Sequence, residues 1–423
     1  MPALLRRLDP AFVLPAAAAV LLPLGVLGPR MINVAASIAA ILAVPWLAMA
    51  RPTPGSASHL SGLAAAWRRP AVVIAALLIA WGAASALWSA NPRQSVEIAL
   101  VLAAIFGGGF VLLAAAARFD TPARDRTVRW FLAGGVTCLV LLAVDLSSAG
   151  MLRSVAAGHG FMTTLTFTHL NRLSSMAALL GWVAVAAVWT RHGPAWAALP
   201  AVASLAVIIV LEPTTPAVAW LAGALFFALG WRSARAAALV LLAIIVLRAL
   251  AVPLFDQIAP AIKDFVIAEG LQHPLQSLGH RLEIWSFAAE MLRERPLTGW
   301  GLDASRSIPG GRELVVIFDN ITNRFSEAMP LHPHSMTAEF WLELGVPGVV
   351  LGVAFVARNL LAVPAAFAGR PAHAGALAMA ATALVMAESS YGIWQDWWLC
   401  TLWLGGAILF AACGPRPTGG TPP

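Results

Sequence analysis

The sequence predicts an all-α polytopic membrane protein with about 12 transmembrane helices and one large, partly helical loop. Hydrophobic residues make up 60% of the 423 residues and charged residues only 11%, with a mean hydropathy of +0.81. A soluble chain of this length needs far more polar surface. The third observation is a series of apolar runs, each long enough to cross roughly 30 Å of hydrocarbon. These runs fall near 11–29, 31–50, 70–89, 96–117, 130–152, 173–190, 195–212, 216–231, 236–255, 335–357, 373–391 and 394–413.

The arginines predict how these spans are oriented. The net charge of +7 comes almost wholly from arginine, since Lys263 is the only lysine. With the N-terminus in the cytoplasm, the opposite short loops hold only Arg30, Arg93, Arg153 and Arg172, as the positive-inside rule requires. Both termini are therefore expected in the cytoplasm and the large loop outside. The basic charge thus indicates membrane topology rather than binding of nucleic acid.

Four regions are expected along the chain. Residues 1–255 form a transmembrane bundle of about nine spans, and residues 335–413 form the C-terminal transmembrane helices. Residues 256–334 form the large outer loop, periplasmic or extracellular, in which a helix is expected to carry catalytic or substrate-binding residues. Residues 414–423 read GPRPTGGTPP, which is typical of a disordered tail, here on the cytoplasmic side.

The large loop contains a predicted helix over 281–294. Arg281 and Trp285 are one turn apart and share a face. A guanidinium beside an indole suits an anionic, sugar-bearing or prenyl-linked ligand. The alternative is an amphipathic interfacial helix with a snorkelling arginine. The sequence Pro296 to Gly301 is expected to end this helix.

The segment His332-Pro333-His334 stands where the large loop re-enters the membrane. Histidine is the natural general base near neutral pH. The spacing alone does not decide between His332 and His334 as the base. Two histidines flanking a proline could also ligate a metal, but no Cys, Asp or further His with ligand-like spacing accompanies them, so no metal is predicted.

Further polar groups gather at the outer ends of other spans. They are Arg153 and Asn171-Arg172 at the two ends of a polar loop, Trp88, Ser89 and Arg93 in WSANPRQS, the hairpin Glu212 to Pro216, and Tyr391, Gln395 and Asp396 in SSYGIWQDWW. Arginines can neutralise a phosphate or pyrophosphate leaving group, and a histidine can deprotonate a hydroxyl. The sequence has no P-loop, no GxGxxG and no Asp-x-Asp pair, so no nucleotide or other cofactor is predicted.

Two long motifs carry a resemblance to a known family. They are RLEIWSFAAEMLRERPLTGWG and HPHSMTAEFWLELGVPGVVLG, preceded by WSANPRQS and FTHLNRLSSMAALL. Their order over residues 70–350 resembles the O-antigen ligase / O-antigen polymerase superfamily.

This resemblance implies a metal-independent, inverting membrane glycosyltransferase that uses undecaprenyl-pyrophosphate-linked glycans. It implies that His334 is the catalytic histidine, which favours His334 over His332 as the base, and that Arg281 binds pyrophosphate. The substrate-binding residues expected with them are Arg172, Arg93, Arg153, Asn171, Trp285, His332 and Asp396.

One departure from the family pattern concerns the outer hairpin. Many members of the superfamily have Ser-Arg where this chain has Thr214-Thr215-Pro216. The role of that arginine is therefore absent here or filled by Arg153, Arg93 or Arg248.

Within the superfamily, a single large outer loop favours a ligase, because polymerases tend to have two. A ligase implies lipid A–core oligosaccharide as acceptor and the inner membrane of a Gram-negative bacterium. The alternatives are an O-antigen polymerase or a protein O-oligosaccharyltransferase, although the latter usually carries a longer soluble C-terminal segment. A transporter or flippase for lipid-linked glycans is the alternative from another class, and it predicts charges near the membrane midplane and inverted repeats.

Overall fold

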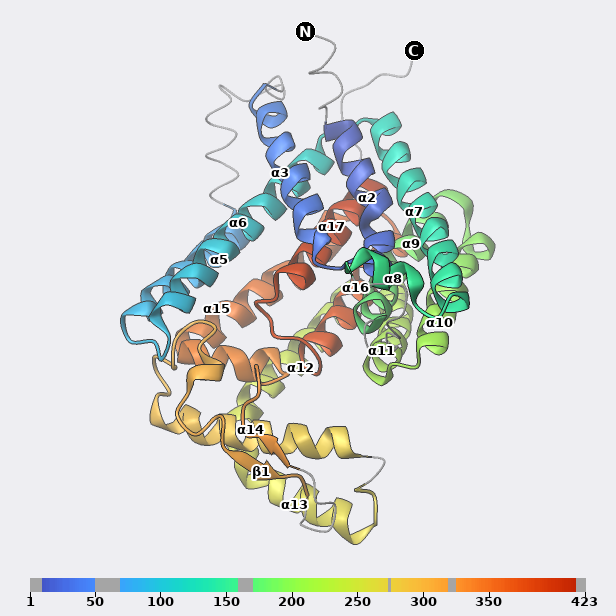
Figure 1. The fold of residues 1–423 in the computed structure, drawn as a ribbon. Coiled ribbons are helices and arrows are strands. Elements are labelled where there is room, and N and C mark those ends of the chain that lie inside the picture. Colours follow the sequence, from blue (N-terminus) through green and yellow to red (C-terminus); the bar gives the residue numbers. More distant parts are fainter. Residues whose placement is uncertain (1–9, 50–68, 159–169, 273–274, 319–324, 416–423) are drawn as a thin grey trace.

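The structure is a computed structural model that describes residues 10–49, 69–158, 170–272, 275–318 and 325–415. The chain forms a helical bundle with a smaller group of helices and strands at one end (Figure 1). Each of the twelve predicted apolar runs corresponds to one long helix. These helices are α2 (Pro10–Leu27), α3 (Met31–Met49), α5 (Pro70–Ala84), α6 (Pro92–Ala117), α7 (Thr121–Ser147), α9 (Asn171–His192), α10 (Pro194–Leu211), α11 (Thr214–Arg232), α12 (Ala234–Ala251), α15 (Met336–Ala366), α16 (Arg370–Ala387) and α17 (Asp396–Cys413).

Nine helices in the described part of the chain are long and apolar enough to cross a membrane. The apolar segments of α2 and α3, Ala11–Leu27 and Met31–Pro45, are shorter. Helix α16 carries Arg370 and His373 in its first turn, which makes its N-terminal end polar. The all-α polytopic membrane class is confirmed, although within the described residues fewer than twelve helices meet the length and hydropathy expected of a full span.

Helix boundaries differ from the predicted runs where caps are present. Helix α7 begins at Thr121 rather than near 130, because Asp120 accepts a hydrogen bond from the Ala123 amide and a proline occupies the first turn. Arg124, which precedes the predicted run at 130–152, therefore lies on the helix. It is buried and donates to the carbonyl oxygens of Phe119 and Gly414, so that it closes the C-terminal end of α17.

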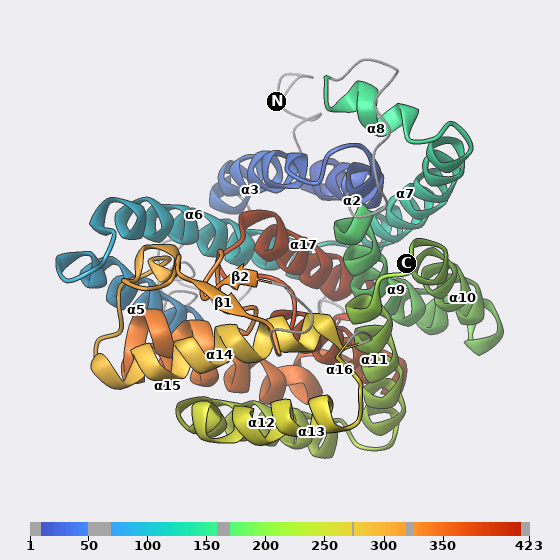
Figure 2. The ribbon, with the colours of Figure 1, turned by 60° about the horizontal axis from the view of Figure 1, so that its bottom comes forward.

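Helix α9 lies at the centre of the bundle. In its membrane-spanning stretch, 89% of the residues are buried inside the protein. The helix packs against α10, α16 and α17. Figure 2 shows α9 between the α7–α10 side and the α16–α17 side. The N-terminal end of α9 carries Asn171 and Arg172, so this buried helix places both residues beside the start of α17.

The segment between α12 and α15 forms the smaller group at one end. It consists of η3 (Val252–Leu254), α13 (Phe255–Ala268), α14 (Gln276–Glu294), η4 (Ser305–Ser307), β1 (Leu314–Val316) and β2 (Phe325–Glu327). The two strands pair antiparallel, with Val315 opposite Ser326. Ion pairs between Lys263 and Glu283 and between Arg293 and Asp256 join α13 to α14. This group lies at the end opposite to the start of α2 and the end of α17 (Figure 1).

The helix predicted at 281–294 is confirmed as α14, which begins five residues earlier and ends at the predicted position. The sequence after it, Pro-Leu-Thr-Gly-Trp-Gly, packs against a break in α15. At the break Gly345 has φ 62°, and helix carbonyls are freed from their usual partners. The amides of Trp300 and Gly301 donate to the carbonyl oxygens of Leu342 and Glu343 at 2.9 and 2.8 Å.

Glycine is required at this contact for two reasons. Gly299 has φ 67°, a left-handed conformation that other residues adopt only with strain, and a Cβ there would overlap the backbone of Glu343. A Cβ at Gly345 would lie 2.5 Å from the Leu297 carbonyl carbon. The two family motifs therefore pack against each other through direct contacts between their backbones.

We expect Gly299→Ala to lower the free energy of unfolding by about 2 kcal/mol or more, because the added methyl meets backbone and the φ angle is strained. The measurement is the thermal unfolding midpoint of the purified protein in detergent. Gly107→Ala in α6 is the matched control, since a Cβ there meets nothing within 4 Å. Equal midpoints for the two variants would contradict the expectation.

Candidate functional site

The two predicted catalytic side chains meet at the segment between α16 and α17, residues 388–396, called here the 388–396 turn. His334 Nδ1 lies 2.6 Å from the carbonyl oxygen of Ser390. Arg281 donates from Nε and Nη2 to the carbonyl oxygen of Ser389 at 3.1 and 2.8 Å. Arg281 comes from α14 and His334 from the segment before α15, so the turn joins two segments that are distant in the sequence.

The backbone around His334 is held in an uncommon conformation. His334 has φ 52°, in the left-handed region that a residue with a side chain rarely adopts. The indole N–H of Trp285 donates to the Pro333 carbonyl oxygen at 2.8 Å, and the His334 amide lies 3.2 Å from His332 Nδ1. These contacts hold the strained backbone, and such strain is common at functional sites.

His332 is a buried ring that stays neutral. Its Nδ1 faces the His334 amide and its Nε2 faces the Gly392 amide, each at 3.2 Å. Only one nitrogen of a neutral imidazole can accept, and an added proton would point at an N–H donor. Burial, together with the nearby His334, lowers the pKa of His332 to about 3. This ring therefore connects residues 332–335, called here the His334 segment, to the 388–396 turn rather than exchanging protons.

His334 is only half-buried, and no described residue forms a hydrogen bond with its Nε2. Because a carbonyl oxygen can only accept, the bond to Ser390 places the proton on Nδ1 and leaves the lone pair on Nε2. Burial lowers the pKa of His334 below its ordinary value, and the positive charges of Arg281 and His280 lower it further. The hydrogen bond to Ser390 opposes this shift in part. The ring is thus suited to accept a proton at neutral pH.

The N-terminal end of α15 binds the Glu388 carboxylate. Ser335 Oγ donates to it at 2.8 Å, and the Thr337 amide and hydroxyl donate at 3.2 and 2.9 Å. Arg248 of α12 lies 3.5 Å from the same carboxylate. A carboxylate is favoured at a helix N-terminus, so Glu388 fixes α15, and with it His334, to the 388–396 turn.

Arg172 approaches the other side of the turn from α9. Its guanidinium lies 5.2 Å over the ring of Trp397. The Tyr391 hydroxyl bonds Ser175 Oγ at 2.9 Å and the Asn171 carbonyl oxygen at 3.3 Å. Among the residues described, the Arg172 guanidinium has no hydrogen bond or ion pair. It is therefore a positioned cation whose N–H donors remain available to a ligand.

The remaining predicted binding residues make other contacts. The Arg93 side chain is 89% exposed and pairs with Glu97 on its own helix at 2.7 Å. Arg153 is buried in α8 (Met151–Ala156), where it pairs with Asp145 at 2.5 Å. Figure 2 shows α8 far from α14. Asp396 is exposed, accepts from Asn33 at 2.5 Å and binds the Trp397 amide at 2.7 Å, which ties α17 to α3.

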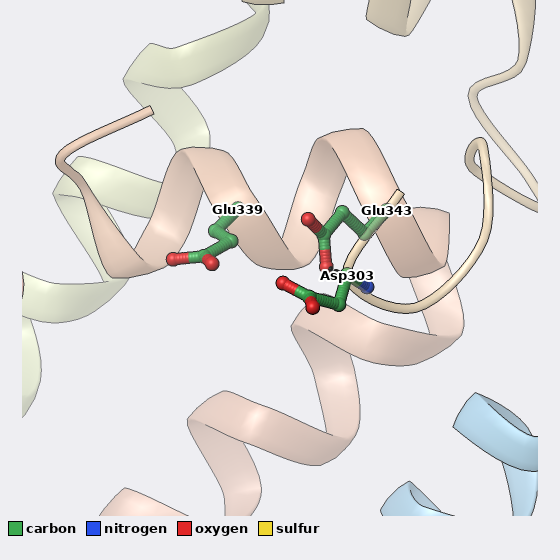
Figure 3. Close-up of side chains that lie close together, drawn as sticks. All are labelled: Asp303, Glu339 and Glu343. Carbon is green, nitrogen blue, oxygen red and sulfur yellow. Dashed lines mark hydrogen bonds between the residues drawn. The ribbon is translucent and has the colours of Figure 1, made fainter. Parts of the chain in front are cut away.

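Three carboxylates lie together behind the turn: those of Asp303, Glu339 and Glu343 (Figure 3). One oxygen of each lies within 4.8 Å of the others, a spacing that could hold a divalent cation. Protein donors already reach all three, because Gln94 Nε2, the Ile393 amide and Trp394 Nε1 donate to them in that order at 2.7, 2.8 and 2.6 Å. Burial raises the pKa of Asp303.

Sequence reasoning missed this carboxylate cluster and the carbonyl oxygens of Ser389 and Ser390. A signal for the cluster existed, since Glu339 and Glu343 are one turn apart in an otherwise apolar helix, where ionisable groups are expensive. No sequence signal could have identified the two carbonyl oxygens, because every residue has one.

An apolar cavity of about 660 Å³ lies apart from this site, along α9 between α7 and α10. It is lined along α9 from Leu173 to His192, and its lining contains no predicted site residue. The cavity is therefore not part of the candidate site.

Comparison with known proteins supports a common origin with polysaccharide ligases. A family model described as O-Antigen ligase matches residues 199–353. A Rickettsia conorii protein named "Putative polysaccharide ligase" is 25% identical over 272 residues, which are 64% of this chain and 63% of the relative. A Rickettsia prowazekii protein of the same description is 24% identical over 278 residues, 64% of each chain. The chain thus spans slightly less than two thirds of the length of either relative.

The fold and the site define a polytopic, all-α membrane protein. At one end of its bundle, His334 and Arg281 bind adjacent carbonyl oxygens of the 388–396 turn. Within this class, the resemblance found in the sequence is confirmed. Residues 199–353 match the O-Antigen ligase family model, so this part of the chain is similar to that family. This segment contains Arg281, Trp285, His332 and His334, whereas Arg172 and the other predicted residues lie outside it.

We expect His334 to titrate with a midpoint below the ordinary value of 6.5, and His332 to stay neutral down to about pH 3. Diethyl pyrocarbonate reacts with neutral imidazole, so modification of His334 should be lost as pH falls through its lowered pKa. Mass spectrometry of digested protein measures both sites between pH 4 and 8, a range based on the ordinary histidine value of about 6.5. A midpoint for His334 above 6.5 would contradict the expectation.

Proposed function

We propose that this protein is an O-antigen ligase. It transfers a glycan from undecaprenyl pyrophosphate to a sugar hydroxyl of lipid A–core oligosaccharide, on the periplasmic face of a Gram-negative inner membrane. The observation that carries the proposal is that His334 and Arg281 bind adjacent carbonyl oxygens, so that His334 Nε2 has no hydrogen-bond partner among the described residues and can act as a base. The family match over residues 199–353 and the polysaccharide-ligase names of the relatives support it.

The mechanism follows from the roles of these groups. His334 Nε2 takes the proton of the acceptor hydroxyl, and the hydroxyl oxygen attacks the anomeric carbon of the donor glycan. The bond from that carbon to the pyrophosphate oxygen breaks, and undecaprenyl pyrophosphate leaves with the electron pair. Arg281 and Arg172 stabilise the charge that develops on the leaving group. Attack opposite to the leaving group inverts the configuration of the anomeric carbon.

The other residues divide into positioning and peripheral groups. Trp285 and His332 hold the His334 segment, since their ring nitrogens contact Pro333 and the Gly392 amide. Asn171 lies next to Arg172 and its carbonyl oxygen accepts from Tyr391. Roles for Arg93, Arg153 and Asp396 in glycan binding stay predictions, because the two arginines are ion-paired and Asp396 accepts from Asn33 and the Trp397 amide.

In this proposal the energy for transfer comes from the activated donor, because the leaving group is a pyrophosphate. No metal or cofactor is assigned a step. An O-antigen polymerase uses the same chemistry with another donor-linked glycan as acceptor, and only the acceptor separates the two functions. The same holds for a protein O-oligosaccharyltransferase, whose acceptor is a protein.

The test is an in vitro transfer reaction. Purified protein in detergent is incubated with undecaprenyl-pyrophosphate-linked glycan and lipid A–core, with EDTA and without ATP. We expect glycan-bearing lipid A–core as product. Donor chains that lengthen without acceptor would instead identify a polymerase, and no reaction with either substrate would refute the proposal.

We expect His334→Ala to slow transfer by about 100-fold or more, which is the usual contribution of a general base. Initial rates at saturating donor and acceptor measure the effect, and unchanged thermal stability shows that the variant is folded. His192→Ala is the matched control, because His192 lies at the far end of α9. Wild-type transfer by His334→Ala would exclude His334 as the base.

A further inference from the structure

Arg248 is a charged residue in the last turn of α12, which belongs to the membrane-spanning segment Ala234–Ala268. Its Nη2 lies 3.3 Å from Ser335 Oγ, and its guanidinium lies 5.2 Å over the ring of Trp285. Ser335 directly follows His334, and Trp285 holds Pro333. Arg248 therefore reaches the His334 segment from α12, whereas Arg281 on α14 donates to Ser389 of the neighbouring 388–396 turn.

Most of the hydrogen-bonding capacity of Arg248 is unused. A guanidinium carries five N–H donors, and in the described part of the chain only Nη2 has a partner within hydrogen-bond or ion-pair distance. The side chain is 31% exposed, so the remaining donors are accessible. Charged groups on membrane-spanning helices are expensive unless they are paired or bind a ligand.

The Glu388 carboxylate does not depend on Arg248 for its hydrogen bonds. The Glu388 carboxylate accepts three other hydrogen bonds, from Ser335 Oγ and from the amide and hydroxyl of Thr337. Glu388 stays hydrogen-bonded if Arg248 turns toward an anionic ligand. The 3.5 Å contact is also longer than a strong charge-assisted hydrogen bond.

We propose that Arg248 binds the pyrophosphate of a lipid-linked substrate together with Arg281, an inference that rests on the proposed function. Arg248 then supplies the guanidinium that the hairpin Thr214-Thr215-Pro216 lacks. Of the other candidates for that place, Arg93 is exposed and paired with Glu97, and Arg153 is buried and paired with Asp145. Arg248 is the one whose contacts lie beside His334.

The experiment measures binding of inorganic pyrophosphate and of farnesyl pyrophosphate to the full chain in detergent by titration calorimetry. We expect Arg248→Gln to weaken binding about tenfold or more, because a charge-assisted contact to the anion is lost. Arg293→Gln is the matched control. It removes an arginine that pairs with Asp256 between α13 and α14, and its affinity should equal that of the wild type.

Two further variants separate binding from a structural role. Arg248→Lys keeps the charge but loses the planar fork, so it should bind pyrophosphate with intermediate affinity. Glu388→Gln removes the competing negative charge but keeps an oxygen that can accept from Ser335 and Thr337, so α15 stays attached and affinity should be unchanged or tighter. A purely structural ion pair predicts instead that Glu388→Gln loses affinity as Arg248→Gln does, and that result would overturn the inference.

The remaining outcomes are also decisive. A folded Arg248→Gln protein with wild-type affinity overturns the role of Arg248 and leaves the proposed function intact. If the wild type binds neither pyrophosphate compound, the donor chemistry of the proposed function is refuted, and the role of Arg248 falls with it.

Discussion

Hydrogen bonding to the backbone of the 388–396 turn is the interaction on which the site depends. Carbonyl oxygens of this turn accept from Arg281 and His334, and its amides donate to His332 and Glu339. A backbone carbonyl or amide has no side-chain torsions about which it can rotate away. It therefore fixes the orientation of its hydrogen-bond partner more firmly than a long, flexible side chain would. The tautomer of His334 follows directly, because the Ser390 carbonyl oxygen can only accept.

A second constraint holds this turn in place relative to the bundle. Helix α15 breaks at Gly345, and the loop after α14 binds the carbonyl groups freed there. Glu343, just before the break, accepts from Ser305 Oγ at 2.5 Å and from Trp394 Nε1 at 2.6 Å. The part of α15 next to its break therefore connects the loop after α14 to the 388–396 turn. Displacement of any one of them would shift the others.

The electrostatics of the site follow from the same arrangement. Arg281, Arg248 and Arg172 approach the turn from three helices, and they have few carboxylate partners among the described residues. Their positive charge suits an anionic ligand and, together with burial, keeps the nearby His334 neutral. An uncharged base beside cations is the combination that proton removal next to a pyrophosphate requires.

The sequence by itself determined the membrane class and the positions of the twelve helices, because apolar runs are local properties of the chain. The family resemblance of its short motifs singled out Arg281 and His334. Only the tertiary structure decided which arginines lie beside the histidine. Arg93, Arg153 and Arg248 all lie at helix ends, yet only Arg248 contacts the His334 segment, since helix packing sets that distance. The carbonyl oxygens of Ser389 and Ser390 and the φ of His334 were also beyond the sequence, because backbone groups are the same at every position and become specific only through folding.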